Sequence, residues 1–157
     1  MRLVIQRVSH AQVQVDGTLT GSCEEGLLIL VGISDADTTR TVEALWDKTK
    51  HLRIFEDDQH KMNRSLLDIR GSVLAISQFT LYATCRHGRR PSFIEAGEPA
   101  HAQALYDHFC SCVEADSVPL GRGRFGEDMT IDACCRGPVT ICLDSERDLP
   151  SSCEPKH

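Results

Sequence analysis

Apolar and polar positions alternate near the start of the chain and predict β-strands there. The alternating apolar residues are Leu3, Ile5, Val13 and Val15, and a period of two is typical of a half-buried strand. Asp16-Gly17 then gives a strong hairpin signal. Residues 27–31 form a continuous apolar run after Gly26, which predicts a strand covered on both faces.

Helical spacing of apolar residues predicts two helices. The first follows Asp37, which we expect to be its N-cap, and its buried face consists of Val42, Leu45, Trp46, Thr49 and Leu52. The second has Pro99 in its first turn, and its buried stripe consists of Ala102, Leu105, Phe109, Cys112 and Val113. Each helix has one apolar face, so both are expected to pack against the core.

Four further segments have strand character, namely 53–55, 72–77 with a continuation to 81, 129–134 and 139–143. The last two flank Gly137-Pro138, which we expect to form a turn or an edge because proline cannot donate to a strand ladder. The order of elements predicts an α/β (α+β) domain with a largely antiparallel sheet and two main flanking helices. Residues 1–145 are expected to form this single domain, and the polar residues 146–157 a disordered C-terminal tail.

Length and composition narrow the class of protein. With 157 residues, of which 41% are hydrophobic and 25% charged, the chain is ordinary for one globular domain. No apolar run approaches the roughly 20 residues that cross a bilayer, and the alternating N-terminus does not resemble a signal peptide. We therefore expect a cytoplasmic protein with no membrane partner.

The net charge of −6 argues against a protein whose main task is to coat nucleic acid. It leaves room for one that holds a nucleic-acid end locally. Arg86, Arg89 and Arg90 lie within five positions, which is compatible either with a small site for a polyanion or with a solvated loop.

Eight cysteines raise the question of zinc or disulfides, but no C-x-x-C pair occurs. Structural zinc sites usually draw ligands from such pairs, so buried, inert thiols are the favoured interpretation. The seven histidines form no spaced cluster. Phosphate-binding loops, the dinucleotide fingerprint and the nucleophile elbow are also absent from the sequence. We therefore expect neither a metal nor a cofactor.

Two segments place polar groups where strands end. In Ser77-Gln-Phe-Thr-Leu81, hydroxyl and amide side chains follow an apolar run, and they form either a satisfied structural network or the wall of a pocket. In Cys135-Arg-Gly-Pro-Val-Thr140, the glycine and proline interrupt two strand patterns. Spacing alone does not decide whether either segment is functional.

The sequence is similar to the D-aminoacyl-tRNA deacylases of the bacterial and eukaryotic type, from Met1 to about Ser145. The matching segments are Val4-Ile-Gln-Arg-Val8, Leu52-Arg-Ile-Phe-Glu56, Lys61-Met-Asn63, Ser77-Gln-Phe-Thr-Leu-Tyr82, Gly88-Arg-Arg-Pro-Ser-Phe93, Gly123-Arg-Phe-Gly126 and Gly137-Pro-Val-Thr140. The resemblance implies a barrel-like fold and a homodimeric esterase. Such an enzyme removes D-amino acids, and glycine mischarged on tRNA(Ala), from the 3′-terminal adenosine of tRNA.

The resemblance also implies roles for particular residues. The pocket for the adenosine and its ester corresponds to the catalytic residues Ser77, Gln78, Phe79 and Thr80. A cis Gly137-Pro138 turn is implied to reach into the partner's pocket and to exclude L-side chains, with Arg7 as its support and Met129 also in contact with substrate. The family usually has Asn where this chain has Cys135, so one side-chain hydrogen bond of the turn is expected to be missing.

Two mechanisms fit these residues. Thr80 could act as a nucleophile, but a hydroxyl needs an adjacent base, and none lies within the motif. We favour attack by water assisted by the ribose 2′-hydroxyl, with backbone N–H groups near Phe79 and Thr80 meeting the oxyanion. Arg86, Arg89 and Arg90 then contact phosphates of the acceptor stem. The alternatives are a non-catalytic tRNA- or RNA-binding module and a thiol-dependent or zinc protein.

Overall fold

The structure is a computed structural model and describes residues 1–150. Its helices are α1 (Thr39–Lys50), the 3₁₀ helix η1 (Phe79–Tyr82), α2 (Pro99–Ala115) and α3 (Ser145–Asp148). Its strands are β1 (Arg2–Val15), β2 (Thr18–Cys23), β3 (Gly26–Gly32), β4 (Phe55–Glu56), β5 (Met62–Arg64), β6 (Ser72–Ser77), β7 (Leu120–Arg122) and β8 (Thr130–Asp144). No helix among these residues is long and apolar enough to cross a membrane.

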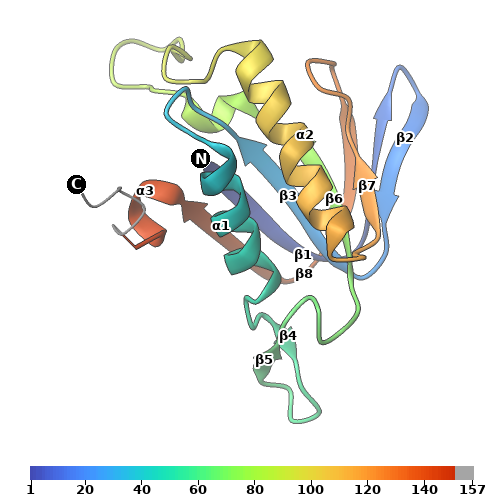
Figure 1. Ribbon diagram of the computed structural model, residues 1–157. Helices are drawn as coiled ribbons and strands as arrows, with labels where there is room; N and C mark the ends of the chain where they lie inside the picture. The colour runs from blue at the N-terminus through green and yellow to red at the C-terminus, as the bar shows by residue number, and fades with distance from the viewer. Residues whose placement is uncertain (151–157) are drawn as a thin grey trace.

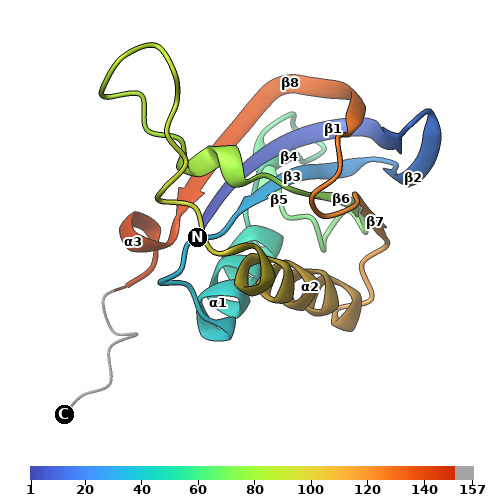
Figure 2. The same ribbon diagram turned by 90° about the horizontal axis from the view of Figure 1, so that it is seen from above.

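The main sheet has the strand order β2-β1-β3-β6-β7, with β8 added along β1 (Figure 2). The long strand β1 pairs antiparallel with β2, β3 and β8, whereas β3–β6 and β6–β7 are parallel. The ends of the sheet approach one another closely, because a Cβ at Gly21 of β2 would lie 2.5 Å from the carbonyl oxygen of Arg122 in β7. The largely antiparallel, barrel-like fold with two main helices is confirmed, with two parallel pairings added.

Two apolar clusters stabilise this arrangement. The larger lies between the sheet and helices α1 and α2, which cover the same face (Figure 1). There Trp46 and Phe109 pack edge to face with ring centroids 5.7 Å apart. The smaller fills the barrel and includes Val13, Leu74 and Ile76. The sheet is therefore buried on both faces over β3 and β6, as the apolar run 27–31 predicts.

The start of α1 differs from expectation. Thr38, not Asp37, is the N-cap, and it forms a capping box with Thr41. Asp37 instead pairs with the ammonium group of Met1 and accepts a hydrogen bond from the backbone of Ser34 at 2.8 Å. The Asp37 carboxylate, which the local sequence predicts to cap the helix, is therefore used in a long-range ion pair instead. The helix also ends at Lys50, so the core residue Leu52 follows it.

Four predicted strands have different limits. The strand at 53–55 is reduced to Phe55–Glu56. The strand at 72–81 stops at Ser77. The N–H of Gln78 makes the last bond to β3, donating to the carbonyl oxygen of Val31 at 2.8 Å, and the chain then turns into η1. The two strands flanking the Gly-Pro pair are one strand, β8, since both halves pair with β1 in the same direction. Gly137-Pro138 therefore forms an irregularity at an edge and not a hairpin turn.

Two other expectations need correction. The segment after Asp144 begins with the short helix α3, which the Asp144 carboxylate caps by accepting from the backbone of Glu146 at 3.0 Å. Residues 151–157 of the expected tail lie outside the described residues, as does Cys153.

Only some of the cysteines in the described region are buried, although the sequence favours buried thiols. Cys23 and Cys110 are buried, and Cys112 is partly buried. The other four are exposed, namely Cys85, Cys134, Cys135 and Cys142. Burial raises the pKa of Cys23 and of Cys110 to about 11, so inertness is supported for these two.

Candidate active site

A cavity of about 310 Å³ opens where β3 and β6 end. Its lining residues are Val31, Ile33, Ile76, Ser77, Gln78, Phe79, Ala102, Phe125, Gly126, Glu127, Asp128, Met129 and Ile131. Four residues singled out from the sequence, Ser77, Gln78, Phe79 and Met129, are among them. The structure thus brings the end of the S-Q-F-T-L segment and Met129 to one concave surface.

The polar groups of this segment are held by the end of β6. Gln78 donates from its side-chain amide to the Thr80 hydroxyl at 2.5 Å, so Thr80 adjoins the cavity wall. An amide cannot take up a proton from this hydroxyl, and no other described residue is bonded to it. The backbone N–H groups of Phe79 and Thr80 open the first turn of η1, where intrahelical acceptors are lacking. These N–H groups are therefore free to bind an oxygen atom.

The opposite wall contains residues that sequence reasoning did not place in the site. Phe125, Glu127 and Asp128 come from the turn between β7 and β8. Gly123 permits this approach, because a Cβ there would lie 2.6 Å from the sulfur of Met129. The sequence feature that could have located this wall is the Gly123-Arg-Phe-Gly126 segment. It resembles a glycine-rich loop in the sequence, but in the structure it forms part of the pocket wall. Its two carboxylates give this side of the pocket negative charge.

Gly137-Pro138 lies away from this cavity. The pair faces Arg7, between the ladder positions Gln6↔Thr140 and Val8↔Cys135, and its peptide bond is cis. Gly137 is six residues beyond the pocket residue Ile131, which corresponds to roughly 20 Å along an extended strand. The turn and the pocket of one chain are therefore separate.

Arg7 is the anchor of this turn. Arg7 is buried, with 9% of the residue exposed. Its side chain donates to the carbonyl oxygen of Ile54 at 2.7 Å and to that of Arg136 at 3.2 Å. Cys135 is exposed and, within the described part of the chain, its side chain contributes no hydrogen bond to the turn. The Arg7 guanidinium thus fixes the backbone just before Gly137, whatever residue occupies position 135.

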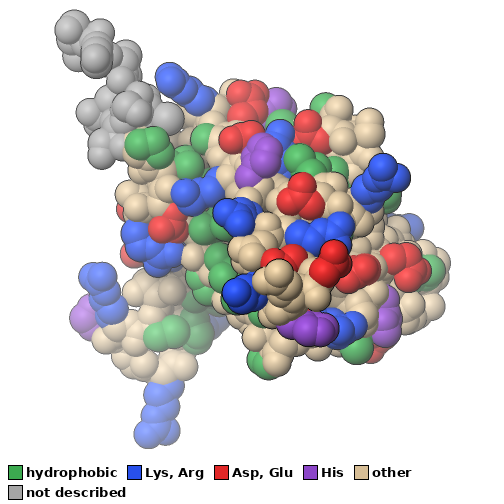
Figure 3. Space-filling view, turned by 90° about the horizontal axis from the view of Figure 1, so that it is seen from below, with side chains coloured by type: hydrophobic (Ala, Val, Ile, Leu, Met, Phe, Trp, Pro, Cys, Tyr) green, Lys and Arg blue, Asp and Glu red, His purple; other side chains and the backbone are tan. Residues whose placement is uncertain are grey.

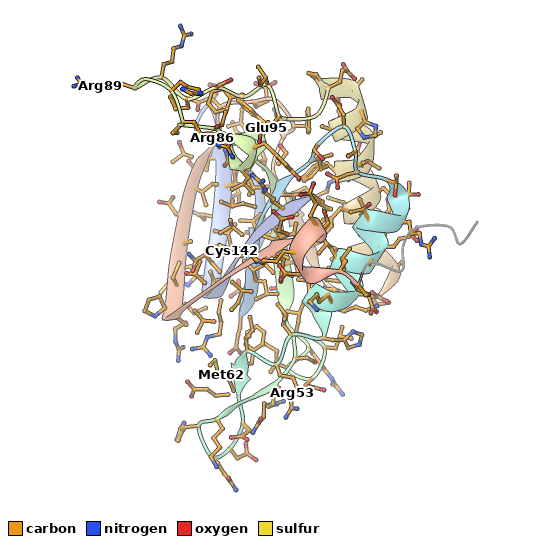
Figure 4. All side chains as sticks on the ribbon, turned by 90° about the vertical axis from the view of Figure 1, so that its left-hand side faces the viewer. Arg53, Met62, Arg86, Arg89, Glu95 and Cys142 are labelled. Atoms are coloured by element: carbon orange, nitrogen blue, oxygen red, sulfur yellow. The ribbon has the colours of Figure 1, made fainter. Side chains whose placement is uncertain are left out.

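The three predicted phosphate-binding arginines lie outside the cavity lining. Arg86, Arg89 and Arg90 are exposed on the loop between η1 and α2, which projects from the end of the molecule opposite Met62 and Arg53 (Figure 4). Over residues 1–150 we find no cluster of three or more His, Cys, Asp or Glu side chains suited to a metal ion.

Comparison with known proteins places the chain in a family. The family described as D-Tyr-tRNA(Tyr) deacylase matches residues 4–144. The chain belongs to this family. It is similar to the D-aminoacyl-tRNA deacylase of Clostridium botulinum (strain Eklund 17B / Type B), with 48% identity over 95% of this chain and 100% of that protein. It is also 54% identical to the D-aminoacyl-tRNA deacylase of Thermomicrobium roseum, over 92% of this chain and 94% of that protein.

Solved structures have the same fold as this chain. One named "c-Myc DNA Unwinding Element Binding Protein" has a TM-score of 0.86 and 34% identity, covering 92% of this chain and 98% of the other. Another, described as a probable eukaryotic D-amino acid tRNA deacylase, has a TM-score of 0.76 at 18% identity, covering 90% and 97%. The second likeness concerns the fold alone.

Proposed function

We propose that this protein hydrolyses the ester bond of D-aminoacyl-tRNA and releases free tRNA and the D-amino acid. The observation that carries the proposal is the cavity lined by Ser77, Gln78 and Phe79 in a chain of the deacylase family. The substrate is then an aminoacyl-tRNA, and its 3′-terminal adenosine occupies the cavity. The cytoplasmic location expected from the sequence stays a prediction that follows from this substrate.

The chemistry of the pocket favours a substrate-assisted reaction. Water attacks the ester carbonyl, the 2′-hydroxyl of the ribose assists the proton transfer, and the ester oxygen leaves on the 3′ side of the adenosine. The free N–H groups of Phe79 and Thr80 stabilise the developing oxyanion, a contribution typically worth about 10²–10³ in rate for one donor. The Thr80 hydroxyl is hydrogen-bonded to an amide, and no carboxylate or imidazole among the described residues is hydrogen-bonded to it, which supports a role other than nucleophile.

We further propose that Gly137-Pro138 acts as a chiral filter in the pocket of a second subunit. The separation of roughly 20 Å along β8 supports action on a partner, and the Arg7 anchor supports a fixed position for the backbone carbonyls. Steric exclusion by backbone atoms suits this task because D- and L-esters present the same polar groups. Glycine has no side chain to exclude, so glycyl-tRNA(Ala) is also accepted.

The decisive experiment incubates the protein with matched D-tyrosyl-, L-tyrosyl- and glycyl-tRNA and follows release of the amino acid. We expect rapid hydrolysis of the D-ester, detectable hydrolysis of the glycyl ester and almost none of the L-ester. Equal rates on the D- and L-esters would refute the chiral filter.

Subunit mixing tests the shared site. A Gly137/Pro138 turn variant and a Ser77/Gln78 pocket variant, each inactive alone, are mixed under conditions of proven subunit exchange. Random exchange makes half the dimers mixed, each with one intact site of two, so roughly a quarter of wild-type activity should return, as a two-fold symmetric dimer requires. No rescue would mean that turn and pocket act within one chain.

A second candidate is nucleic-acid binding without turnover. It is favoured by the name of the solved relative with 34% identity, which refers to binding of a DNA unwinding element. Such a module would bind nucleic acid whether or not an amino acid is attached to it, and it would release no amino acid. The same incubation therefore separates the two candidates.

A further inference from the structure

The rim of the cavity carries an exposed apolar patch that the proposed reaction does not use. Among the described residues six large hydrophobic residues are exposed. Two of them, Phe79 and Phe93, are in contact here, and a third, Ile94, follows Phe93 in the chain. Their exposed fractions are 57%, 39% and 88%. The rings of Phe79 and Phe93 meet edge to face, with centroids 5.1 Å apart and planes at 74°. In such a pair the edge of one ring covers at most one of the four ring faces, so aromatic surface remains for a ligand.

The backbone holds this aromatic pair at the mouth of the cavity. Phe79 lines the cavity, and Phe93 follows a two-way backbone bridge between Thr84 and Ser92, with N···O distances of 2.8 and 2.9 Å. The far side of the loop is tied down where Gly97 donates to Ile33 at 2.9 Å. The patch, here called the aromatic rim (Phe79, Phe93 and Ile94), is thus anchored on both sides.

The same loop brings positive charge beside the aromatic rim. Residues 83–97 contain Arg86, Arg89 and Arg90 against the single carboxylate of Glu95. Among residues 1–150, some arginines elsewhere, such as Arg2, pair with a carboxylate and others, such as Arg70, do not. In the described part of the chain the three loop guanidinium groups have no such partner, and this loop gathers all three within five residues. On the face shown in Figure 3, acidic and basic side chains are interspersed. A protein with a net charge of −6 therefore has unpaired cations next to exposed rings.

We propose that the aromatic rim binds the unpaired nucleotides that precede the terminal adenosine, with Phe93 as the stacking residue and Ile94 as its apolar flank. Exposed rings beside arginines are the combination that binds single-stranded nucleic acid, because every base has a face for stacking and every linkage a phosphate. The inference rests on the proposed function for the position of the terminal nucleotide. It adds a second subsite, outside the cavity.

The rival occupant of the aromatic rim is a second copy of this chain. The unpaired arginines favour RNA, because a symmetric contact would bring two sets of like charges together.

The test compares a long and a short substrate. Phe93→Leu keeps an apolar side chain against Phe79 but removes the stacking face, whereas Phe93→Trp keeps it. On D-tyrosyl-tRNA we expect Phe93→Leu to raise KM roughly tenfold, equivalent to about 1.4 kcal/mol, and Phe93→Trp to restore it. On D-tyrosyl-adenosine, which lacks the preceding nucleotides, both variants should match the wild type. Leu19→Ala, which removes another exposed apolar side chain, is the matched control.

Each other outcome has a distinct meaning. An equal loss on both substrates makes Phe93 a support for Phe79 and overturns the proposal. A loss accompanied by dissociation in sedimentation assigns the aromatic rim to a subunit contact and also overturns it. Binding of a labelled five-nucleotide RNA ending in cytidine-cytidine-adenosine is measured by anisotropy in parallel. If the wild type hydrolyses neither ester, the proposed function fails, and a tenfold weaker RNA affinity of Phe93→Leu still decides the aromatic rim.

Discussion

Replacement of Gly137 by alanine tests how tightly the turn on β8 is held. Gly137 has φ +117°, a conformation that residues with a side chain rarely adopt. A Cβ at this position would lie 2.9 Å from the backbone nitrogen of Val139 and 3.0 Å from the Arg7 guanidinium. The backbone cannot yield without moving the turn, and Arg7 cannot yield without loosening its bonds to Ile54 and Arg136. Gly137→Ala therefore displaces the proposed filter.

The expected effect on activity is larger than the effect on stability. A side chain forced into a sparsely populated backbone region costs about 1–3 kcal/mol, and this exposed site can relax toward solvent, so the low end applies. A displacement of about 1 Å in a positioning group lowers a rate by about 10²-fold. We expect hydrolysis of D-tyrosyl-tRNA to fall by about two orders of magnitude while the free energy of unfolding falls by about 1 kcal/mol.

Gly17→Ala is the matched control for this prediction. Gly17 also has positive φ, +76°, but a Cβ there meets nothing within 4 Å. Gly17→Ala therefore places a side chain at positive φ, as Gly137→Ala does, but the new Cβ collides with nothing. Rates of amino-acid release and urea unfolding curves are measured for both variants. If Gly137→Ala and Gly17→Ala lose similar stability and both retain wild-type rates, the reasoning about the turn is wrong.

Three further predictions concern the mechanism and the fold. In single-turnover assays, Thr80→Ala should lower the rate of D-tyrosyl-tRNA hydrolysis only partly, whereas a tRNA ending in 2′-deoxyadenosine should be a poor substrate. Complete loss of activity in Thr80→Ala together with full activity on the deoxy substrate would support a Thr80 nucleophile. Tyr106→Phe removes the buried hydrogen bond to the Ala75 carbonyl oxygen, 2.9 Å long, and should cost about 1 kcal/mol of unfolding free energy, so an unchanged urea midpoint would contradict it. The Lys50 ammonium lowers the pKa of Asp116 from 3.8, so the stability from this pair is present above that pH and is lost as the pH falls through the lowered value. Asp116→Asn should consequently flatten the acid limb of a plot of Tm against pH, and an identical limb would count against the pair.

Periodic patterns predicted the elements whose neighbours are close in sequence. The Asp16-Gly17 hairpin is confirmed by positive φ at both residues, +49° and +76°, and the strand at 27–31 lies inside β3. Local patterns could not find the Met1–Asp37 ion pair, because its partners are joined only when β1 folds back against the start of α1. They also could not distinguish a hairpin turn between two strands from a turn within one strand at Gly137-Pro138, since the difference depends on pairing of both flanks with β1.

The candidate site shows the same difference between features that local sequence patterns reveal and features that depend on the folded chain. The S-Q-F-T-L segment was found because polar residues are unusual at the end of a buried strand. Glu127 and Asp128 were missed because polar residues in a turn are ordinary, and only the approach of Gly123 to Met129 brings that turn to the pocket. The exposed thiols of Cys134 and Cys135 were misjudged because the sequence does not show that β8 is an edge strand.

The position of β8 links the fold to the proposed dimer. Within the described residues this fifteen-residue strand pairs only with β1, and its residues 132–138 are exposed. Natural proteins protect long edge strands, because their unpaired backbone groups attract other chains. Helix α1 packs over the face of the sheet, where β8 contributes Leu143 to the core (Figure 1), but no described strand pairs with the outer edge of β8. A second subunit on this surface would cover the edge and carry Gly137-Pro138 into reach of a neighbouring pocket. Protection of the edge and completion of the active site are then one event, so a variant that weakens the contact should lose hydrolysis of D-tyrosyl-tRNA and gain aggregation together.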